Sequence, residues 1–275
     1  MIELLDYDFM RRALLAAVFT GLAAPAIGVF LVHRRLSLLG DGLGHVALTG
    51  VALGLLTGVA PLVTAIAVSA LGALLIELLR AKGRTSGDVA LAMLFYGGIA
   101  GGVLLANLAD ESAASLNAYL FGAITTVSSG ELVLVGALGV VIIVLCLGLS
   151  PQLFAVCQDE EHARVSGLPV WLLSALISVL AAVTITVAMR TVGLLLVSAL
   201  MVVPVAASQQ VTRSFRSTHL LAMAIGLAAA IGGVVASYEV ETSPGPTIVM
   251  LAIGAFAVLA VVGALRRRVR PAPTR

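Results

Sequence analysis

Asp41 and His45 are the residues whose types and spacing most suit chemistry in this chain. They lie in the stretch SLLGDGLGHVALTG, from Ser37 to Gly50, at the start of a long apolar run. Four residues turn about 400° around an α-helix, so both side chains would point to one side, displaced by one turn. A carboxylate and a neutral imidazole in that arrangement can share a divalent ion, and these donors suit zinc as well as manganese or iron.

A structural role is the alternative for this pair. Aspartate is favoured at the N-terminus of a helix, where Asp41 could act as a cap. His45 could then be an ordinary core histidine. Glycines at 40, 42 and 44 leave the backbone open to the approach of an ion or of another helix. The pattern by itself leaves both roles open.

The composition of the chain indicates that the helix with Asp41 and His45 lies in a membrane. Hydrophobic residues make up 60% of the 275 residues and charged residues 11%, with a mean hydropathy of +1.13, whereas soluble domains average about 25% charged residues. The apolar runs are continuous and reach the ~20 residues that a spanning helix needs, without the alternation of a β-barrel. The sequence therefore predicts an all-α polytopic transmembrane bundle of eight or nine spans: 10–31, 41–58, 61–79, 89–107, 131–149, 169–189, 191–208, 218–237 and 246–265.

The positive charges predict the orientation. Loops between successive spans lie on alternate sides of the membrane. One set of loops, with the C-terminal tail, holds 13 of the 16 Lys and Arg residues, and the other side holds Arg11, Arg12 and Arg190. Because basic loops stay inside, the first set and the C-terminus are expected in the cytoplasm. The chain then divides into one transmembrane domain, 1–265, and a basic cytoplasmic tail, 266–275. We interpret the tail as a stop signal at the membrane face, so no nucleic-acid partner is expected.

A polar loop within the basic set is the second informative stretch. The segment 157–168 holds consecutive acids, then a short amphipathic piece, then a glycine that would end a helix. A short cytoplasmic helix of this kind could dock a soluble partner. The residues expected to make that contact are Asp159, Glu160, Glu161, His162, Ala163, Arg164 and Gly167.

The remaining polar residues fit simpler roles. Glu77, near Arg80 at a helix end, is expected to reach the membrane interface. Ser128 to Glu131 has the form of a capping box. Glu239 and Glu241, in the predicted outer loop, could attract a cation at an outer mouth or form a solvated turn.

Two absences narrow the function. The two cysteines, Cys146 and Cys157, make no metal motif and are expected to be apolar filler. No phosphate-binding P-loop, nucleophile elbow or His-Glu-x-x-His motif occurs, so the chain is not expected to be an enzyme.

Four stretches, in order along the chain, resemble one family. They are RRLSLLGDGLGHVALTGVALG (34–54), NAYLFGAITTVSSGEL (117–132), MRTVGLLLVSALMVVPVAASQQVTRSF (189–215) and YEVETSPGPTIVM (238–250). Together they are similar to the membrane permease subunits of bacterial metal ABC importers, which carry zinc, manganese or iron. The likeness is greatest to high-affinity zinc uptake permeases, although manganese permeases share the same Asp and His.

The resemblance implies the remaining expectations. The fold would be that of a type II ABC importer permease in the bacterial plasma (inner) membrane. Two copies would pair as a homodimer around a pathway that Asp41 and His45 face. Zn²⁺, or Mn²⁺ or Fe²⁺, would be the cargo, with no permanently bound cofactor. Separate ATP-binding-cassette ATPase subunits would dock on 157–168 and hydrolyse ATP, and an extracytoplasmic metal-binding protein would deliver the ion.

Two rival classes of function stay open. An ion-coupled secondary transporter usually has inverted repeats and several intramembrane carboxylates, whereas this chain offers mainly Asp41 and no clear internal repeat. A membrane scaffold that transports nothing would leave Asp41 and His45 without a role.

Overall fold

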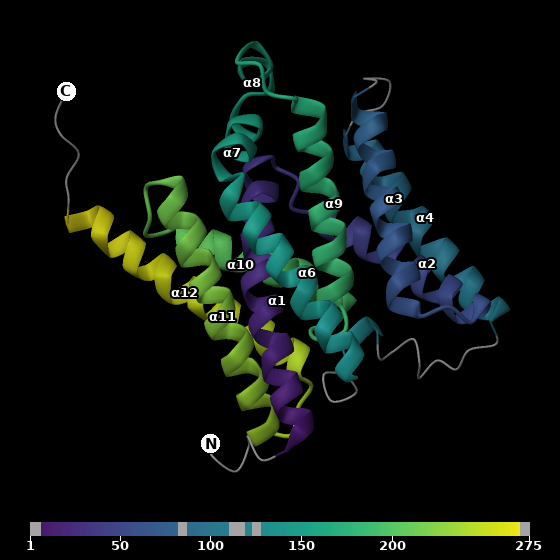
Figure 1. Cartoon of the computed structure of the whole chain (residues 1–275). Helices are drawn as coiled ribbons and strands as arrows, with labels where there is room; N and C mark the ends of the chain where they lie inside the picture. Colours follow the sequence, from purple (N-terminus) through teal and green to yellow (C-terminus); the bar gives the residue numbers. More distant parts are fainter. Residues whose placement is uncertain (1–6, 82–86, 110–118, 123–127, 270–275) are drawn as a thin grey trace.

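The structure is a computed structural model that describes residues 7–81, 87–109, 119–122 and 128–269. Within these ranges the chain forms α-helices and no strands (Figure 1). The all-α prediction is confirmed. The helices are α1 (Asp8–His33), α2 (Leu39–Thr57), α3 (Pro61–Ala81), α4 (Gly87–Leu108), α6 (Ser129–Gly148), α7 (Ser150–Gln158), α8 (Glu160–Val165), α9 (Val170–Ala188), α10 (Leu194–Gln209), α11 (Phe215–Glu239) and α12 (Pro244–Val269).

Each expected span corresponds to one of these helices. In the described ranges, eight helices are long and apolar enough to cross a membrane, and α10 is a shorter apolar helix. Helix α12 continues to Val269, past the boundary at 265 that the sequence suggested. The last residues of the expected basic tail, 270–275, lie outside the described part of the chain.

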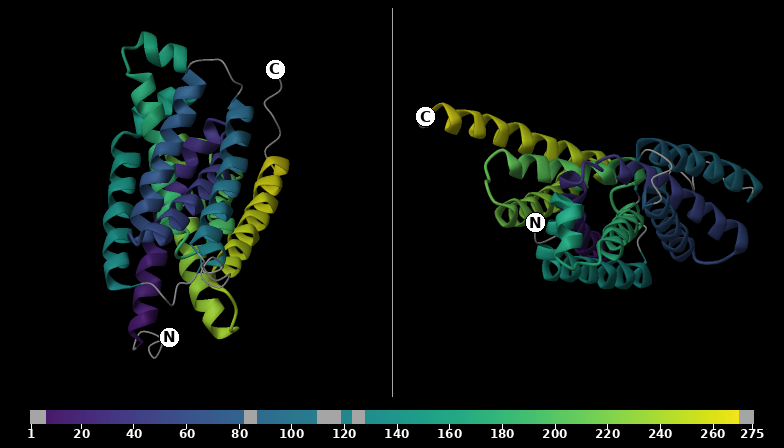
Figure 2. Two further views of the ribbon diagram at one scale, coloured as in Figure 1. Left: turned by 90° about the vertical axis from the view of Figure 1, so that its right-hand side faces the viewer. Right: turned by 90° about the horizontal axis from the view of Figure 1, so that it is seen from above.

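The helices pack as two groups that share α9 and α10. Helix α2 packs against α3 and α4, while α1 packs against α6, α10 and α11. Both α9 and α10 contact members of each group, and α12 covers α10 and α11. Figure 2 shows the α2–α4 group to one side of the bundle when it is seen from above. The two shared helices therefore connect the element that carries Asp41 and His45 to the rest of the molecule.

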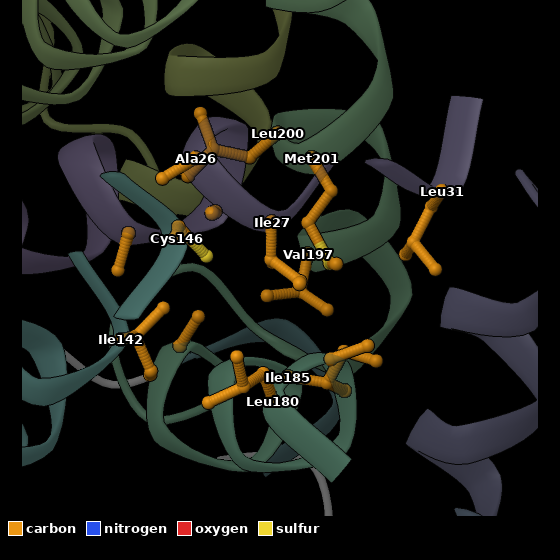
Figure 3. Close-up of a cluster of buried hydrophobic side chains, with 14 of the residues drawn as sticks. Ala26, Ile27, Leu31, Ile142, Cys146, Leu180, Ile185, Val197, Leu200 and Met201 are labelled. Atoms are coloured by element: carbon orange, nitrogen blue, oxygen red, sulfur yellow. The ribbon is translucent and has the colours of Figure 1, made fainter. Parts of the chain in front are cut away.

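Small and branched apolar side chains fill the centre of the bundle. Figure 3 shows part of this core, with Ala26 and Ile27 of α1, Ile142 and Cys146 of α6, and Met201 of α10. A Cβ on Gly28 would lie 2.0 Å from the backbone oxygen of Met201, so α1 and α10 cross where no side chain separates them. Such close crossings let helices pack in an apolar solvent, where burial alone gives little attraction between them.

The two ends of the bundle differ. Helix α8 projects at one end (Figure 1), which we call the α8 end. The start of α1 and the end of α11 lie at the opposite end, where Phe9 and Glu239 line one cavity.

The predicted capping box is confirmed at the start of α6, because Ser128 Oγ accepts from the Glu131 backbone N–H and the Glu131 carboxylate accepts from the Ser128 N–H.

Candidate functional site

Asp41 lies in the first turn of α2, and His45 follows one turn later. The N-cap position is held by Leu38, and no side chain caps the helix. Asp41 therefore does not cap α2. Both side chains are partly exposed.

The carboxylate of Asp41 reaches across to α10. Ser198 Oγ donates a hydrogen bond to Asp41 Oδ1. Beside it, a Cβ on Gly40 would lie 3.1 Å from the Ser198 Cβ, so the start of α2 lies directly against α10. Sequence reasoning missed Ser198, and the available signal was a hydroxyl within the otherwise apolar run LLLVSALMVV.

The imidazole of His45 faces α4. Its ring packs edge to face on Phe95, with 4.6 Å between the ring centroids, and its Nδ1 atom is buried without a hydrogen-bond partner. Gly98 on α4 permits this approach, because a Cβ there would lie 2.7 Å from the backbone at His45 and Val46. A buried imidazole nitrogen without a partner is unusual and can accept a proton or a metal ion.

Together the two side chains offer one oxygen and one nitrogen donor. No group of three or more His, Cys, Asp or Glu that could hold a metal ion occurs among the described residues. A closed zinc site uses four protein ligands. Asp41 and His45 of one chain supply half of that number.

Helix α8 is an exposed helix with a buried anchor. Asp159 caps it, since its Oδ1 accepts from the backbone N–H groups of Glu161 at 2.9 Å and His162 at 3.0 Å. Ala163 is buried in the core. Gly167, at φ +81°, follows the end of the helix. The other predicted contact residues are exposed: Asp159, Glu160, Glu161, His162 and Arg164.

Glu77 corrects the sequence analysis. It was expected at the membrane interface, but it is buried, and its Oε2 accepts from Ser178 Oγ at 3.2 Å. Arg80 Nη1 lies 3.5 Å from Oε2 and Arg34 Nη2 lies 3.9 Å from Oε1. Arg80 is a neighbour on the same helix, but Ser178 lies on α9 and Arg34 follows α1, so the sequence near Glu77 could not reveal these two.

Glu239 and Glu241 lie apart from Asp41 and His45. They are exposed at the end of α11, on the rim of a cavity of about 510 Å³ that Phe9 and Met10 also line. Helix α11 packs mainly against α1, α10 and α12, whereas α2 packs mainly against α3, α4, α9 and α10. The structure therefore does not bring the two predicted pairs of side chains into one site.

Comparisons with known proteins agree with this architecture. Residues 6–263 match the model of the ABC 3 transport family. The chain is 31% identical over 246 residues to the manganese import system permease protein ScaB of Streptococcus parasanguinis, covering 89% of this chain and 87% of that protein. It is 28% identical over 245 residues to the high-affinity zinc uptake system membrane protein ZnuB of Haemophilus influenzae, covering 89% and 94%.

A solved structure is similar over nearly the whole chain. It is PsaBC from Streptococcus pneumoniae in complex with Fab, with a TM-score of 0.81 and 30% sequence identity over 94% of this chain and 95% of the other. The likeness therefore extends through all the helix groups described above. The chain belongs to the ABC 3 transport family, and it is a membrane permease of a metal ABC importer.

Proposed function

We propose that this permease imports a divalent transition metal ion into the cytoplasm and that zinc is its cargo. One observation carries the proposal: Asp41 and His45 stand one turn apart on α2, and His45 Nδ1 is buried without a hydrogen-bond partner. Nitrogen and oxygen donors suit zinc, and they also accept manganese or iron. Manganese or iron import by the same route is the alternative.

The ion would meet donors from two copies of the chain. One copy supplies Asp41 and His45, and a homodimer around a central pathway would supply two of each. Four donors of this kind are enough for a zinc ion, yet each copy alone holds it weakly. Such an arrangement suits transport, because the ion has to leave the site after it has bound.

The other partners follow from the two ends of the bundle. ATP-binding-cassette ATPase subunits would dock on the exposed α8 helix and hydrolyse ATP, so this chain itself is no enzyme. An extracytoplasmic metal-binding protein would deliver the ion at the opposite end, where Glu239 and Glu241 could attract it. The protein would lie in the bacterial plasma (inner) membrane with α8 and the C-terminus in the cytoplasm, the orientation that the basic loops favour.

Metal uptake by cells that lack their own importers tests the proposal. The permease is expressed with its ATPase and binding protein, and zinc and manganese uptake are measured for the wild type and for Asp41→Ala combined with His45→Ala. We expect zinc uptake that the double substitution abolishes at equal membrane levels. The matched control is Asp8→Ala, which removes an exposed carboxylate at the start of α1.

Each other result points elsewhere. Manganese uptake without zinc uptake would show that the cargo is manganese and not zinc. Uptake that persists without the ATPase would favour an ion-coupled secondary transporter. Equal uptake by the wild type and the double variant would show that Asp41 and His45 do not lie on the transport pathway.

A further inference from the structure

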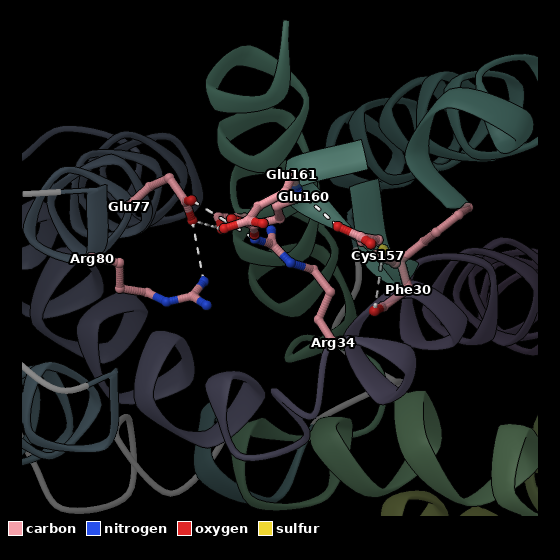
Figure 4. A network of polar contacts seen from close by, with 9 residues as sticks. Phe30, Arg34, Glu77, Arg80, Cys157, Glu160 and Glu161 are labelled. Carbon is pink, nitrogen blue, oxygen red and sulfur yellow. Dashed lines mark hydrogen bonds and ion pairs between the residues drawn. The ribbon is translucent and has the colours of Figure 1, made fainter. Parts of the chain in front are cut away.

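Four charged side chains meet at the α8 end of the bundle (Figure 4): those of Arg34, Glu77, Arg80 and Glu160. Arg34 Nη2 donates to Glu160 Oε1 on α8 at 2.5 Å and lies 3.9 Å from Glu77 Oε1 on α3. The other oxygen of Glu77 lies 3.5 Å from Arg80 Nη1 and accepts from Ser178 Oγ on α9 at 3.2 Å. Arg34 is therefore the link between α8 and the carboxylate of α3.

The burial of the cluster makes it more than a surface ion pair. The side chains of Arg34 and Glu77 are 4% and 7% exposed, while that of Glu160 is 49% exposed. Exposed ion pairs contribute little to stability, but removing one partner of a buried pair leaves an unpaired charge away from water. The arginine thus faces the buried carboxylate of Glu77 on its inner side, and it meets α8 through a carboxylate that solvent or a partner can reach.

The backbone fixes Arg34 relative to α2. Arg34 follows α1, and Arg35 adopts a left-handed conformation at φ 59°. The Arg35 N–H bonds to the Val32 oxygen at 3.1 Å and the Leu36 N–H to the Leu31 oxygen at 2.8 Å, which is the Schellman arrangement that ends a helix. Helix α2 begins at Leu39, so this hydrogen-bonded turn leads directly into the helix that carries Asp41 and His45.

We propose that Arg34 transmits the position of α8 to the transport site. A displacement of α8 would move Glu160, and the ion pair between Glu160 and Arg34 would move Arg34 with it. Arg34 would in turn displace the α1–α2 turn and, through Glu77, helix α3. Arg34, Glu77 and Glu160 are positioning residues in this scheme, because none of them touches the ion. The inference rests on the proposed function, in which α8 is the docking helix of the ATPase.

The test is the number of metal ions imported per ATP hydrolysed. Permease and ATPase are purified together and reconstituted in liposomes, with the binding protein and zinc outside. Glu160→Gln and Arg34→Met should keep the ATPase bound and hydrolysing ATP, while uptake per ATP falls about tenfold, within the usual range for coupling between linked sites. Asp8→Asn and Arg35→Met are the controls, since both side chains are exposed and lie outside both the cluster and α8.

Two results would overturn the inference while leaving metal transport intact. One is unchanged uptake per ATP in Glu160→Gln and Arg34→Met. The other is loss of the ATPase from the purified complex, which would make the two residues docking contacts instead of transmitters. Absence of wild-type transport of any metal would instead reject the proposed function.

A distance measurement tests the link without transport. Spin labels replace the exposed Leu78 on α3 and Val165 on α8 in a permease whose Cys146 and Cys157 are changed to alanine. Arg34→Met should broaden the distance distribution between the labels, and Arg35→Met should leave it as in the parent. An Arg34→Met distribution as narrow as the parent's would show that Arg34 does not hold α8 to α3.

Discussion

Ser198 Oγ on α10 donates a hydrogen bond to Asp41 Oδ1 on α2. The serine is only 8% exposed, and 157 residues separate it from the aspartate along the chain. A hydroxyl that bonds one carboxylate oxygen fixes the direction in which the group presents its remaining lone pairs. If Asp41 binds the ion as proposed, loss of this orienting hydroxyl should cost about 10- to 100-fold in affinity.

We therefore expect Ser198→Ala to weaken metal import without removing it. The apparent affinity for zinc should fall by roughly tenfold or more, as is typical when an orienting partner is lost. The measurement is the concentration dependence of uptake in the cell assay. Ser208→Ala is the control, because Ser208 is also buried on α10 but bonds to Val205 of its own helix. Equal affinities for the two variants would contradict an orienting role.

Two adjacent glycines on α4 predict opposite outcomes for one substitution. A Cβ on Gly98 would lie 2.7 Å from the backbone at His45 and Val46, whereas a Cβ on Gly97 would meet nothing within 4 Å. Gly98→Ala should lower the free energy of unfolding by about 1–3 kcal/mol, the usual cost of overpacking, and should displace His45. Gly97→Ala should be tolerated.

Thermal unfolding in detergent and zinc uptake at equal membrane levels check this pair of variants. Similar midpoints for Gly97→Ala and Gly98→Ala would mean that α2 and α4 do not approach as closely as described.

The capping box at the start of α6 predicts a smaller effect on stability. Ser128→Ala removes the acceptor for the Glu131 backbone N–H, and loss of such a cap costs about 1 kcal/mol. Ser129→Ala changes the next residue, which is already inside the helix, and is the control. A lower unfolding midpoint for Ser128→Ala alone is expected, and an equal shift for both variants would argue against the cap.

Cys157, on α7 beside the charged cluster, predicts a pH dependence. Burial raises the pKa of its thiol from 9.0 to about 12, with Glu160 adding to the rise and Arg34 opposing it. Because the folded pKa is raised, the thiol contributes stability fully below pH 9, and this contribution is lost as the pH rises from 9 toward 12.

Alkylation by iodoacetamide measures this shift. In a Cys146→Ala background, Cys157 should react at pH 8 roughly a hundredfold more slowly than a cysteine placed at the exposed Val165, since thiolate is the reactive form. The rate at Cys157 should still be climbing at pH 10, where the rate at position 165 has levelled off. Matching pH profiles would show that Cys157 is not buried.

Local sequence was enough to predict the helices. Every expected span has a helix at its place, and the boundaries agree within a few residues. The reason is that a backbone in lipid must satisfy its own hydrogen bonds, so a long apolar run has essentially one solution. The spacing of Asp41 and His45 gave only their separation of about one helical turn on α2, and the side chains contact different helices, Ser198 of α10 and Phe95 of α4.

Partners across helices could not be predicted in the same way. Glu77 looked like an interface residue beside Arg80, yet its burial depends on Ser178 and on Arg34, which lie on other elements. The edge-to-face contact of His45 with Phe95 depends on Gly98, whose small size matters only once α4 lies against α2.

The sequence alone thus determined the class of this protein, its helices and its candidate ligands. The length of an apolar run and the periodicity of a helix can both be recognised within one continuous segment. Only the tertiary structure decided which side chains surround those ligands. Ser198 bonds to Asp41, and Arg34 lies between Glu160 of α8 and Glu77, because the packing of small residues brings distant helices into contact.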